Sequence, residues 1–466
     1  MPEEPGGELV EEGSFRVDRS RLLEKLQAFQ LKEPKQFMTP FLRCAAASGA
    51  TRAEARDLDS PPGFEIRFDG RPFTRGELQD PYQCLLEKEK LKLRRNRQLA
   101  YGLLAALRLK PKAVTVLSGK GTERIELRAR SLREEEFIPP EPGEDTVIRV
   151  RWSRWPKEFS FRSPCKVFTA LNDVSDCLLP VTFGDWTTEP PSSAGKRPGD
   201  MFFKENAICG RVRRAELEAG TVREKSLVRL QALGVGVESL ELDSEFAPVD
   251  ATFNDDAFRL DVSQSSIVRD ERYDRVKAIV KRWARELLKR ELDVQAARMP
   301  QTGKLLLDPA LLPYWKARLA GRDAWAALQT DWLRNLRDML PAALTPAWLA
   351  RRRYDLPPGA RELHFDGLRT LWLRKTAEMI LPAGQPLETQ DELGRRLWDV
   401  PLFFDARGEG LSLKQAHAFF EPAQRLFFVR APLPGAVNAD RLVWITSSQD
   451  EEFLSRWFRL AFEMPF

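Results

Sequence analysis

FLRCAAASGATRAEARDLDSPPGFEIRFDGRPFTRGEL, residues 41–78, is the stretch that decides the fold of the N-terminal part of the chain. Its opening, together with the residues from Gln36 onward, is apolar and rich in small side chains, and it ends at Gly49. This pattern predicts a buried helix with a glycine C-cap. GFEIRFDG, residues 63–70, then alternates apolar and polar side chains before an Asp-Gly turn, which predicts a strand. A buried helix needs a sheet to pack against, so the sequence predicts a mixed α+β domain.

Later segments are predicted to complete that sheet. AVTVLSGKG, residues 113–121, and TERIELRAR, residues 122–130, predict two strands joined as a hairpin. The charged stretch before them, residues 86–109, becomes apolar in its second half and predicts a helix. Gly-Lys-Gly-Thr in the hairpin lacks the spacing of a phosphate-binding P-loop, so we interpret it as a turn.

The domain organisation follows from changes in composition along the chain. PPEPGEDT, residues 139–146, has the composition of a linker, and strand-like and helix-like patterns alternate after it. A Trp-, Leu- and Arg-rich stretch with helical spacing comes next, and the C-terminal residues alternate again between strand and helix patterns. We therefore predict four parts: an N-terminal domain over 1–140, a middle α+β domain over 141–298, a helical segment over 299–395 and a small α/β unit over 396–466.

Composition limits the classes of function. The 466 residues are 42% hydrophobic and 31% charged, which is typical of a folded soluble chain, and the net charge of +5 is a mild bias. We expect a cytoplasmic protein without membrane contact, because the sequence starts with an acidic segment and has no apolar stretch long enough for a signal or a membrane span. Five cysteines without a C-x-x-C pair and two histidines predict neither a disulfide framework, nor a metal site, nor a histidine-based catalytic triad.

Two stretches carry a resemblance to a known family. Residues 41–78 resemble the opening of the GHKL (Bergerat) nucleotide-binding fold, in which a helix ending in D-A-G-A-T leads to a strand and a glycine-bearing turn. RNRQLAYGLLAALRLKPKAVTVLSG, residues 95–119, is similar to the passage from lid to helix to strand in that family. If nucleotide binds, ATP or ADP with magnesium, the resemblance implies a site that includes four residues of this sequence. They are Asp69, Gly70, Gly102 at a helix N-terminus facing the phosphates, and Ser118 behind the base.

The chain also resembles one branch of that superfamily beyond its first domain. Residues 226–273, which contain FRLDVSQSSIV, resemble the middle domain of the ninety-kilodalton heat-shock chaperones. Residues 410–431 and 441–454 are similar to later passages of the same chaperones, and the first domain also resembles the N-terminal region of MutL mismatch-repair proteins. The resemblance implies a GHKL-like α/β sandwich followed by a chaperone-middle-domain-like α+β domain, a helical segment and a small C-terminal α/β unit.

The residues that turn over ATP in the family are replaced in this sequence. The family's acid, asparagine and aspartate of the second helix fall on Pro40, Cys44 and Ala47. The aspartate that binds the adenine falls on Phe68, and the arginine that reaches the terminal phosphate falls on Gln264. Neither a proline nor a thiol can activate water or hold magnesium as those groups do, and a neutral amide lacks the charge of an arginine finger. We therefore expect a pseudo-ATPase with no required cofactor, and a Phe68 that is buried in the former base site.

Three functions stay open at this point. The first is a non-enzymatic chaperone-like or scaffold protein that acts on protein partners or clients. The second is an ATP- or ADP-binding switch or weak ATPase, and the third is MutL-like association with DNA through the basic residues 88–97. Two of the sequence features have a structural alternative. The basic run can be a solvated helix face, as such runs often are. The tryptophans of residues 315–372 can pack a core as readily as they form a surface for a partner.

Overall fold

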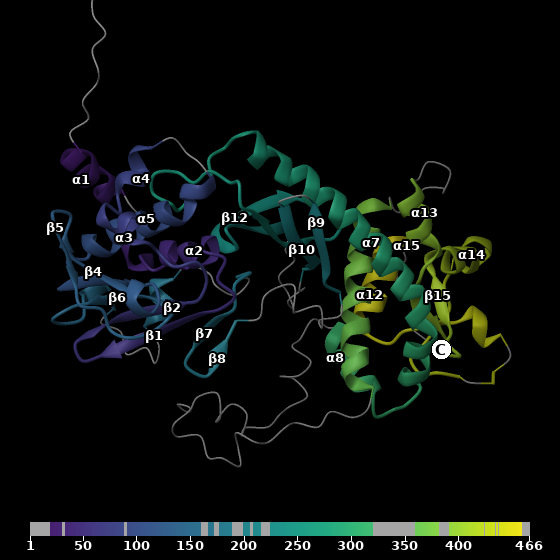
Figure 1. Cartoon of the computed structure of the whole chain (residues 1–466). Helices are drawn as coiled ribbons and strands as arrows, with labels where there is room; N and C mark the ends of the chain where they lie inside the picture. Colours follow the sequence, from purple (N-terminus) through teal and green to yellow (C-terminus); the bar gives the residue numbers. More distant parts are fainter. Residues whose placement is uncertain are drawn as a thin grey trace, which may run out of the picture. The chain divides into compact units, whose positions relative to one another are not determined.

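The computed structural model describes residues 19–29, 33–87, 91–159, 166–171, 177–188, 199–205, 208–215, 224–319, 359–381, 391–423, 425–433, 435–436 and 438–458. These residues form two compact units, and each is described by itself (Figure 1). The first unit contains Met1–Ser193, Leu230–Glu238 and Asn254–Tyr273, and the second contains the remaining residues.

The first unit is built on an eight-stranded sheet with the order β5-β4-β3-β6-β2-β1-β7-β8. Neighbouring strands are antiparallel except β1 and β7, which are parallel. The strands are β1 (Ala53–Asp59), β2 (Pro62–Phe68), β3 (Ala113–Ser118), β4 (Ile125–Ser131), β5 (Glu134–Ile138), β6 (Thr146–Arg151), β7 (Val181–Phe183) and β8 (Trp186–Thr187).

Helices cover one face of this sheet. The helices are α1 (Arg19–Phe29), α2 (Thr39–Ala47), α3 (Arg75–Gln79), α4 (Gln83–Leu86), α5 (Arg94–Arg108) and α6 (Val167–Ala170). α2 packs against α5, and the two helices contact β2 and β3 respectively. One core cluster joins Phe41 of α2 and Leu103 of α5 to Phe64, Ile66 and Phe68 of β2. The unit is therefore a two-layer α/β sandwich.

The alternation in β2 sets the two faces of the sheet. Phe64, Ile66 and Phe68 face the helices, so Glu65 lies on the opposite face, as the two-residue period of a strand requires. Glu65 is nevertheless only 2% exposed, and it pairs with Arg149 of β6 at 2.6 Å. Burial alone would raise the pKa of Glu65, but the arginines around it hold that pKa below the ordinary value.

Local patterns predicted several of these elements correctly. α2 ends at Ala47 and is followed by the positive-φ Gly49, β2 occupies the predicted strand, and β3 pairs with β4 as the predicted hairpin. The predicted linker before residue 147 does not open a new sheet, because β6 lies between β3 and β2 in the first one. The first unit therefore continues past the boundary predicted at residue 140.

The chain after residue 199 forms a second sheet with the order β12-β11-β13-β10-β9. Its strands are β9 (Met201–Glu205), β10 (Ile208–Arg214), β11 (Lys225–Ala232), β12 (Val235–Asp243) and β13 (Val249–Asp255). The long helix α7 (Glu271–Leu306) follows and contains Pro300. The predicted strand-then-helix pattern is present, but the boundary predicted at residues 298/299 falls inside α7.

The C-terminal part is again mixed, as predicted. A four-stranded sheet has the order β15-β14-β17-β16. Its strands are β14 (Pro401–Asp405), β15 (Gly410–Ser412), β16 (Phe428–Val429) and β17 (Val443–Trp444). The helices of this part and of the preceding segment are α8 (Leu312–Leu319), α12 (Ala360–Ile380), α13 (Glu392–Asp399), α14 (Leu413–Ala423) and α15 (Ser448–Phe458). The boundary predicted at residue 396 falls inside α13.

Two of the tryptophans in the predicted helical segment are core residues. Trp315 and Trp372 are both 0% exposed, and their indole nitrogens donate to Thr446 and to the carbonyl of Pro248 at 2.9 Å and 2.8 Å. Residues 320–358, with three further tryptophans, lie outside the described residues. At the described positions, core packing is therefore the role of these side chains.

Candidate functional site

The positions that the resemblance assigns to the catalytic groups of the second helix are buried or half-buried. Pro40 and Cys44 of α2 are buried, and Ala47 is half-buried at the end of the helix. Burial raises the pKa of the Cys44 thiol to about 12, so this sulfur is protonated at neutral pH. Phe68 at the end of β2 is 1% exposed and belongs to the same core cluster as Cys44, which confirms the prediction that it is buried.

Asp69, the first candidate residue, stabilises the loop between α2 and β1. Its carboxylate accepts hydrogen bonds from the backbone N–H of Thr51 at 2.7 Å and of Arg52 at 3.0 Å, and from the Thr51 hydroxyl. Desolvation raises the pKa of Asp69, but the hydrogen bonds from Thr51 and Arg52 outweigh it and lower the pKa overall. Both carboxylate oxygens are therefore used by the loop between α2 and β1.

Gly70 lets the chain pass close to the end of α2. Its φ is +101°, and a Cβ at this position would lie 2.8 Å from the carbonyl oxygen of Ser48 and 2.9 Å from the nitrogen of Ala50. The next residue, Arg71, donates its N–H to the same Ser48 carbonyl at 2.9 Å. Only glycine combines this φ with so close an approach, which gives Gly70 a structural reason to be present.

Gly102 lies inside a helix rather than at its N-terminus. α5 begins at Arg94, so Gly102 is about 12 Å along the axis from the first residue at 1.5 Å per residue. A Cβ on Gly102 would lie 2.3 Å from a ring carbon of Phe41. The glycine therefore permits close packing of α5 on α2, a role different from the phosphate contact that the resemblance implied.

Ser118 is completely buried at the end of β3. Its hydroxyl accepts a hydrogen bond from the N–H of Phe73 at 2.8 Å and shares a hydrogen bond with the Thr146 hydroxyl, also at 2.8 Å. The side chain thus joins β3, β6 and the segment after β2. The structure places all four candidate residues in the first unit, and it gives each of them a partner or close neighbour within the chain.

Arg43 was missed at the sequence level, although it is the one charged residue in FLRCAAA. It is 1% exposed, and its guanidinium donates to the carbonyl of Gln264 at 3.0 Å and to that of Gly236 at 2.9 Å. Burial lowers the pKa of Arg43 to about 10, while the charge of Asp261 acts in the opposite direction. The guanidinium therefore stays charged at neutral pH and holds two distant segments of the first unit against α2.

The basic residues 88–97, which run into the start of α5, are partly used by the protein itself. Arg95 is buried, contacts the Phe73 ring at 4.3 Å and forms an ion pair with Glu77. Arg97 donates to the carbonyls of Cys84 and Glu87 at 3.1 Å and 2.6 Å. Residues 88–90 lie outside the described part of the chain. These two arginines therefore have internal structural partners.

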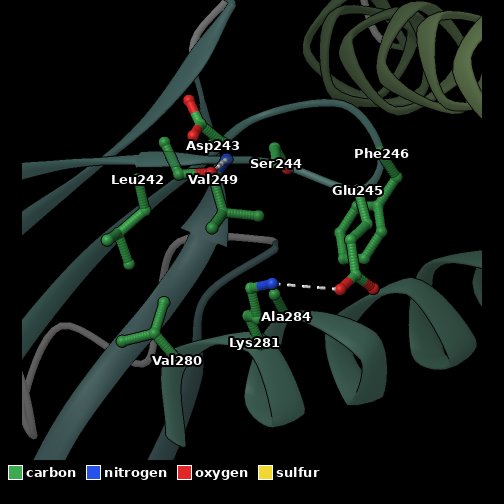
Figure 2. A pocket seen from close by; sticks show the side chains of 10 residues that line it. Leu242, Asp243, Ser244, Glu245, Phe246, Val249, Val280, Lys281 and Ala284 are labelled. Carbon is green, nitrogen blue, oxygen red and sulfur yellow. Dashed lines mark hydrogen bonds and ion pairs between the residues drawn. The ribbon is translucent and has the colours of Figure 1, made fainter. Parts of the chain in front are cut away.

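A small hollow lies in the second unit between β12, the following loop and α7 (Figure 2). Leu242, Val249 and Val280 give it an apolar wall, and Lys281 bonds to Glu245 at 3.2 Å at its edge. Its volume is about 20 Å³, which is room for about one water molecule. This hollow is too small for a cofactor.

Metal and membrane sites receive no support from the described residues. Among them, no group of three or more His, Cys, Asp and Glu side chains is placed to hold a metal ion. No helix in the described ranges has the length and apolar character to cross a membrane.

No protein-family model matches the chain, and no curated protein matches it either.

Proposed function

We propose that this chain is a non-enzymatic chaperone-like or scaffold protein that acts through protein partners, and that its first unit is a degenerate GHKL domain. The observation that carries the proposal is the burial of Pro40 and Cys44 in α2 and of Phe68 in β2. In the family these places belong to groups that activate water, hold magnesium and bind the base. Here they hold side chains that cannot do this chemistry.

The architecture is compatible with this origin. A mostly antiparallel sheet with α2 and α5 on one face is the layered arrangement that the resemblance implies. Within it, the hydroxyl of Ser118 and the carboxylate of Asp69 are occupied by hydrogen bonds from the chain itself. A base or ribose would have to displace these bonds, and replacing satisfied buried hydrogen bonds costs free energy. The proposal therefore assigns the domain a structural and partner-binding role.

Hydrolysis of ATP by the purified full chain provides the first test. We expect phosphate release with magnesium and ATP to equal that of buffer, and a Ser118→Ala variant to give the same value. Release that exceeds the buffer value and is lost in Ser118→Ala would contradict the proposal, because it would place a working site next to β3. Titration with magnesium nucleotides separates a binding-only switch, since a ligand of the folded state raises the melting temperature.

The partner-binding role needs its own assay. We expect the full chain, at equimolar amounts, to reduce the light scattering of a chemically denatured model protein, with no further effect of magnesium and ATP. A reduction that requires ATP would instead favour the nucleotide switch. Binding to duplex DNA with affinity that falls steeply as salt increases would favour the DNA-associated alternative.

A further inference from the structure

A polar cavity lies beside α5, on the side where residues 256–264 of the same unit pack. Its volume is about 110 Å³. The lining residues come from α5, from the β11–β12 turn and from residues 256–264: Arg94, Arg97, Gln98, Tyr101, Ala232, Leu233, Asp256, Phe258, Arg259, Leu260 and Gln264. All of them belong to the first unit.

The orientation of the Gln264 amide is fixed by its neighbours. Gln264 adopts a φ of +58° and is 4% exposed. Its side-chain Nε2 donates to the carbonyl oxygen of Asp261 at 3.0 Å. The other end of the amide, Oε1, is therefore the acceptor that faces Gln98, and it receives a hydrogen bond from Gln98 Nε2 at 3.4 Å.

This arrangement leaves an acceptor of Gln98 without a donor. Because Nε2 of Gln98 is directed to Gln264, its Oε1 must point elsewhere, and no described residue donates to it. Gln98 is only 8% exposed and lines the cavity. Buried acceptors are normally satisfied, so this oxygen calls for a ligand that supplies an O–H or N–H donor.

The charged residues that line the cavity indicate the sign of the charge on that ligand. Three arginines and one aspartate line it, which leaves an excess of positive charge. Arg97 is bonded to two backbone carbonyls, and the Asp256 carboxylate accepts from the Asn254 amide at 2.9 Å. Within the described ranges, the Arg94 guanidinium forms no ion pair. An anion next to Arg94 would supply the missing partner.

We propose that this cavity binds a protonated oxyanion of the size of hydrogen phosphate, with anionic oxygens at Arg94 and the P–O–H group donating to Oε1 of Gln98. The cavity volume of about 110 Å³ is well above the roughly 10–15 Å³ that a single water molecule needs, so the cavity has room for a phosphate group of five heavy atoms. The site uses side chains on the face of α5 that packs against residues 256–264, and it needs neither the core around Phe68 nor a base-binding pocket. It includes Gln264, where the resemblance places the arginine that reaches the terminal phosphate, but binding of phosphate is measured without ATP hydrolysis, so its failure can be told apart from failure of the function proposed above.

Titration calorimetry of the full chain with inorganic phosphate and with sulfate, at equal ionic strength and neutral pH, tests this proposal. Both ions are tetrahedral, but sulfate carries no proton at this pH and cannot donate to Gln98. We expect phosphate to bind at least about tenfold more tightly than sulfate. Methyl phosphate serves as a second ligand: binding equal to phosphate indicates the terminal group of a larger molecule, and much weaker binding indicates free phosphate.

Variants separate the two features of the site. Arg94→Gln is expected to weaken phosphate binding by about tenfold or more, since it removes a charge-assisted hydrogen bond. Gln98→Leu should reduce the preference for phosphate over sulfate to near unity. Arg108→Gln removes the same charge from the last turn of the same helix, outside the cavity, and should leave binding unchanged.

Circular dichroism spectra identify any variant that fails to fold. If Arg94→Gln fails, Arg259→Gln at an exposed position of the cavity replaces it as the variant that removes a positive charge. The proposal is overturned if phosphate and sulfate bind equally, if Arg94→Gln and Arg108→Gln have the same effect, or if no heat is observed up to about 10 mM phosphate.

Discussion

Replacement of Gly102 by alanine should destabilise the first unit, although the same change stabilises most helices. Alanine is favoured over glycine in a helix interior by about 1 kcal/mol. At this position, however, the new Cβ would lie 2.3 Å from the ring of Phe41, whereas 3.4–4 Å is ordinary contact. Phe41 is 0% exposed and cannot turn away into solvent. Overpacking of a filled core costs about 1–3 kcal/mol, so we expect a net loss of up to about 2 kcal/mol.

Urea denaturation followed by circular dichroism measures this difference. Gly76→Ala is the matched control, because Gly76 is also helical and a Cβ there meets nothing within 4 Å, so the free energy of unfolding should stay equal or rise. In a Phe41→Leu background the smaller side chain should reduce the cost of Gly102→Ala by about 1 kcal/mol, as expected for residues in contact. If Gly102→Ala raises the free energy of unfolding by about 1 kcal/mol in the parent chain, the reasoning is refuted.

Three further predictions concern buried or half-buried groups. Phe68→Asp should lower the free energy of unfolding by more than about 3 kcal/mol, because it opens a cavity and buries a carboxylate, and it should not create ATP binding; an unchanged urea midpoint would contradict this. Desolvation and the charge of Asp80 raise the pKa of Glu135 from 4.5 to about 7 in the folded chain, so this group makes the free energy of unfolding fall as pH rises between those values. Glu135→Gln should flatten that pH dependence in urea melts at successive pH values, and an unaltered slope would exclude the assignment. Arg374→Met should cost about 3–5 kcal/mol by leaving the buried Asp450 carboxylate unpaired, and chemical denaturation that shows less than about 1 kcal/mol would show that the pair contributes little.

Segments with a strong local signal were predictable from the sequence. α2 and β2 follow from a small-residue apolar run that ends in glycine and from a strict alternation, and both patterns depend only on neighbours along the chain. The burial of Phe68 was expected from the resemblance, which places this apolar side chain where the family binds the base. In contrast, β1 was not predicted, because AEARDLD contains no β-branched or aromatic residue, and it becomes a strand by pairing with β2 on one side and β7 on the other.

Domain boundaries were harder to predict from the sequence, also because they depend on contacts between distant segments. PPEPGEDT has the composition of a linker, yet the strand after it is inserted between β3 and β2. The composition of a segment indicates only its local conformation. Which strands pair with it depends on the packing of the whole sheet. The same holds for α7, which stays helical across the position where the sequence pattern changes, even though it contains Pro300.

The amino-acid sequence by itself determined the α+β class and the main helix and strand patterns of the first domain. It also places Pro40, Cys44 and Phe68 at positions where the resemblance implies acids and amides. Only the tertiary structure decided what the polar groups do. Arg43 meets acceptors that lie 193 and 221 positions away, and Gln98 meets an amide 166 positions away. A hydrogen bond depends on distance and direction in space, and no local pattern encodes such pairs, so the buried guanidinium and the unpaired acceptor become visible only in the folded chain.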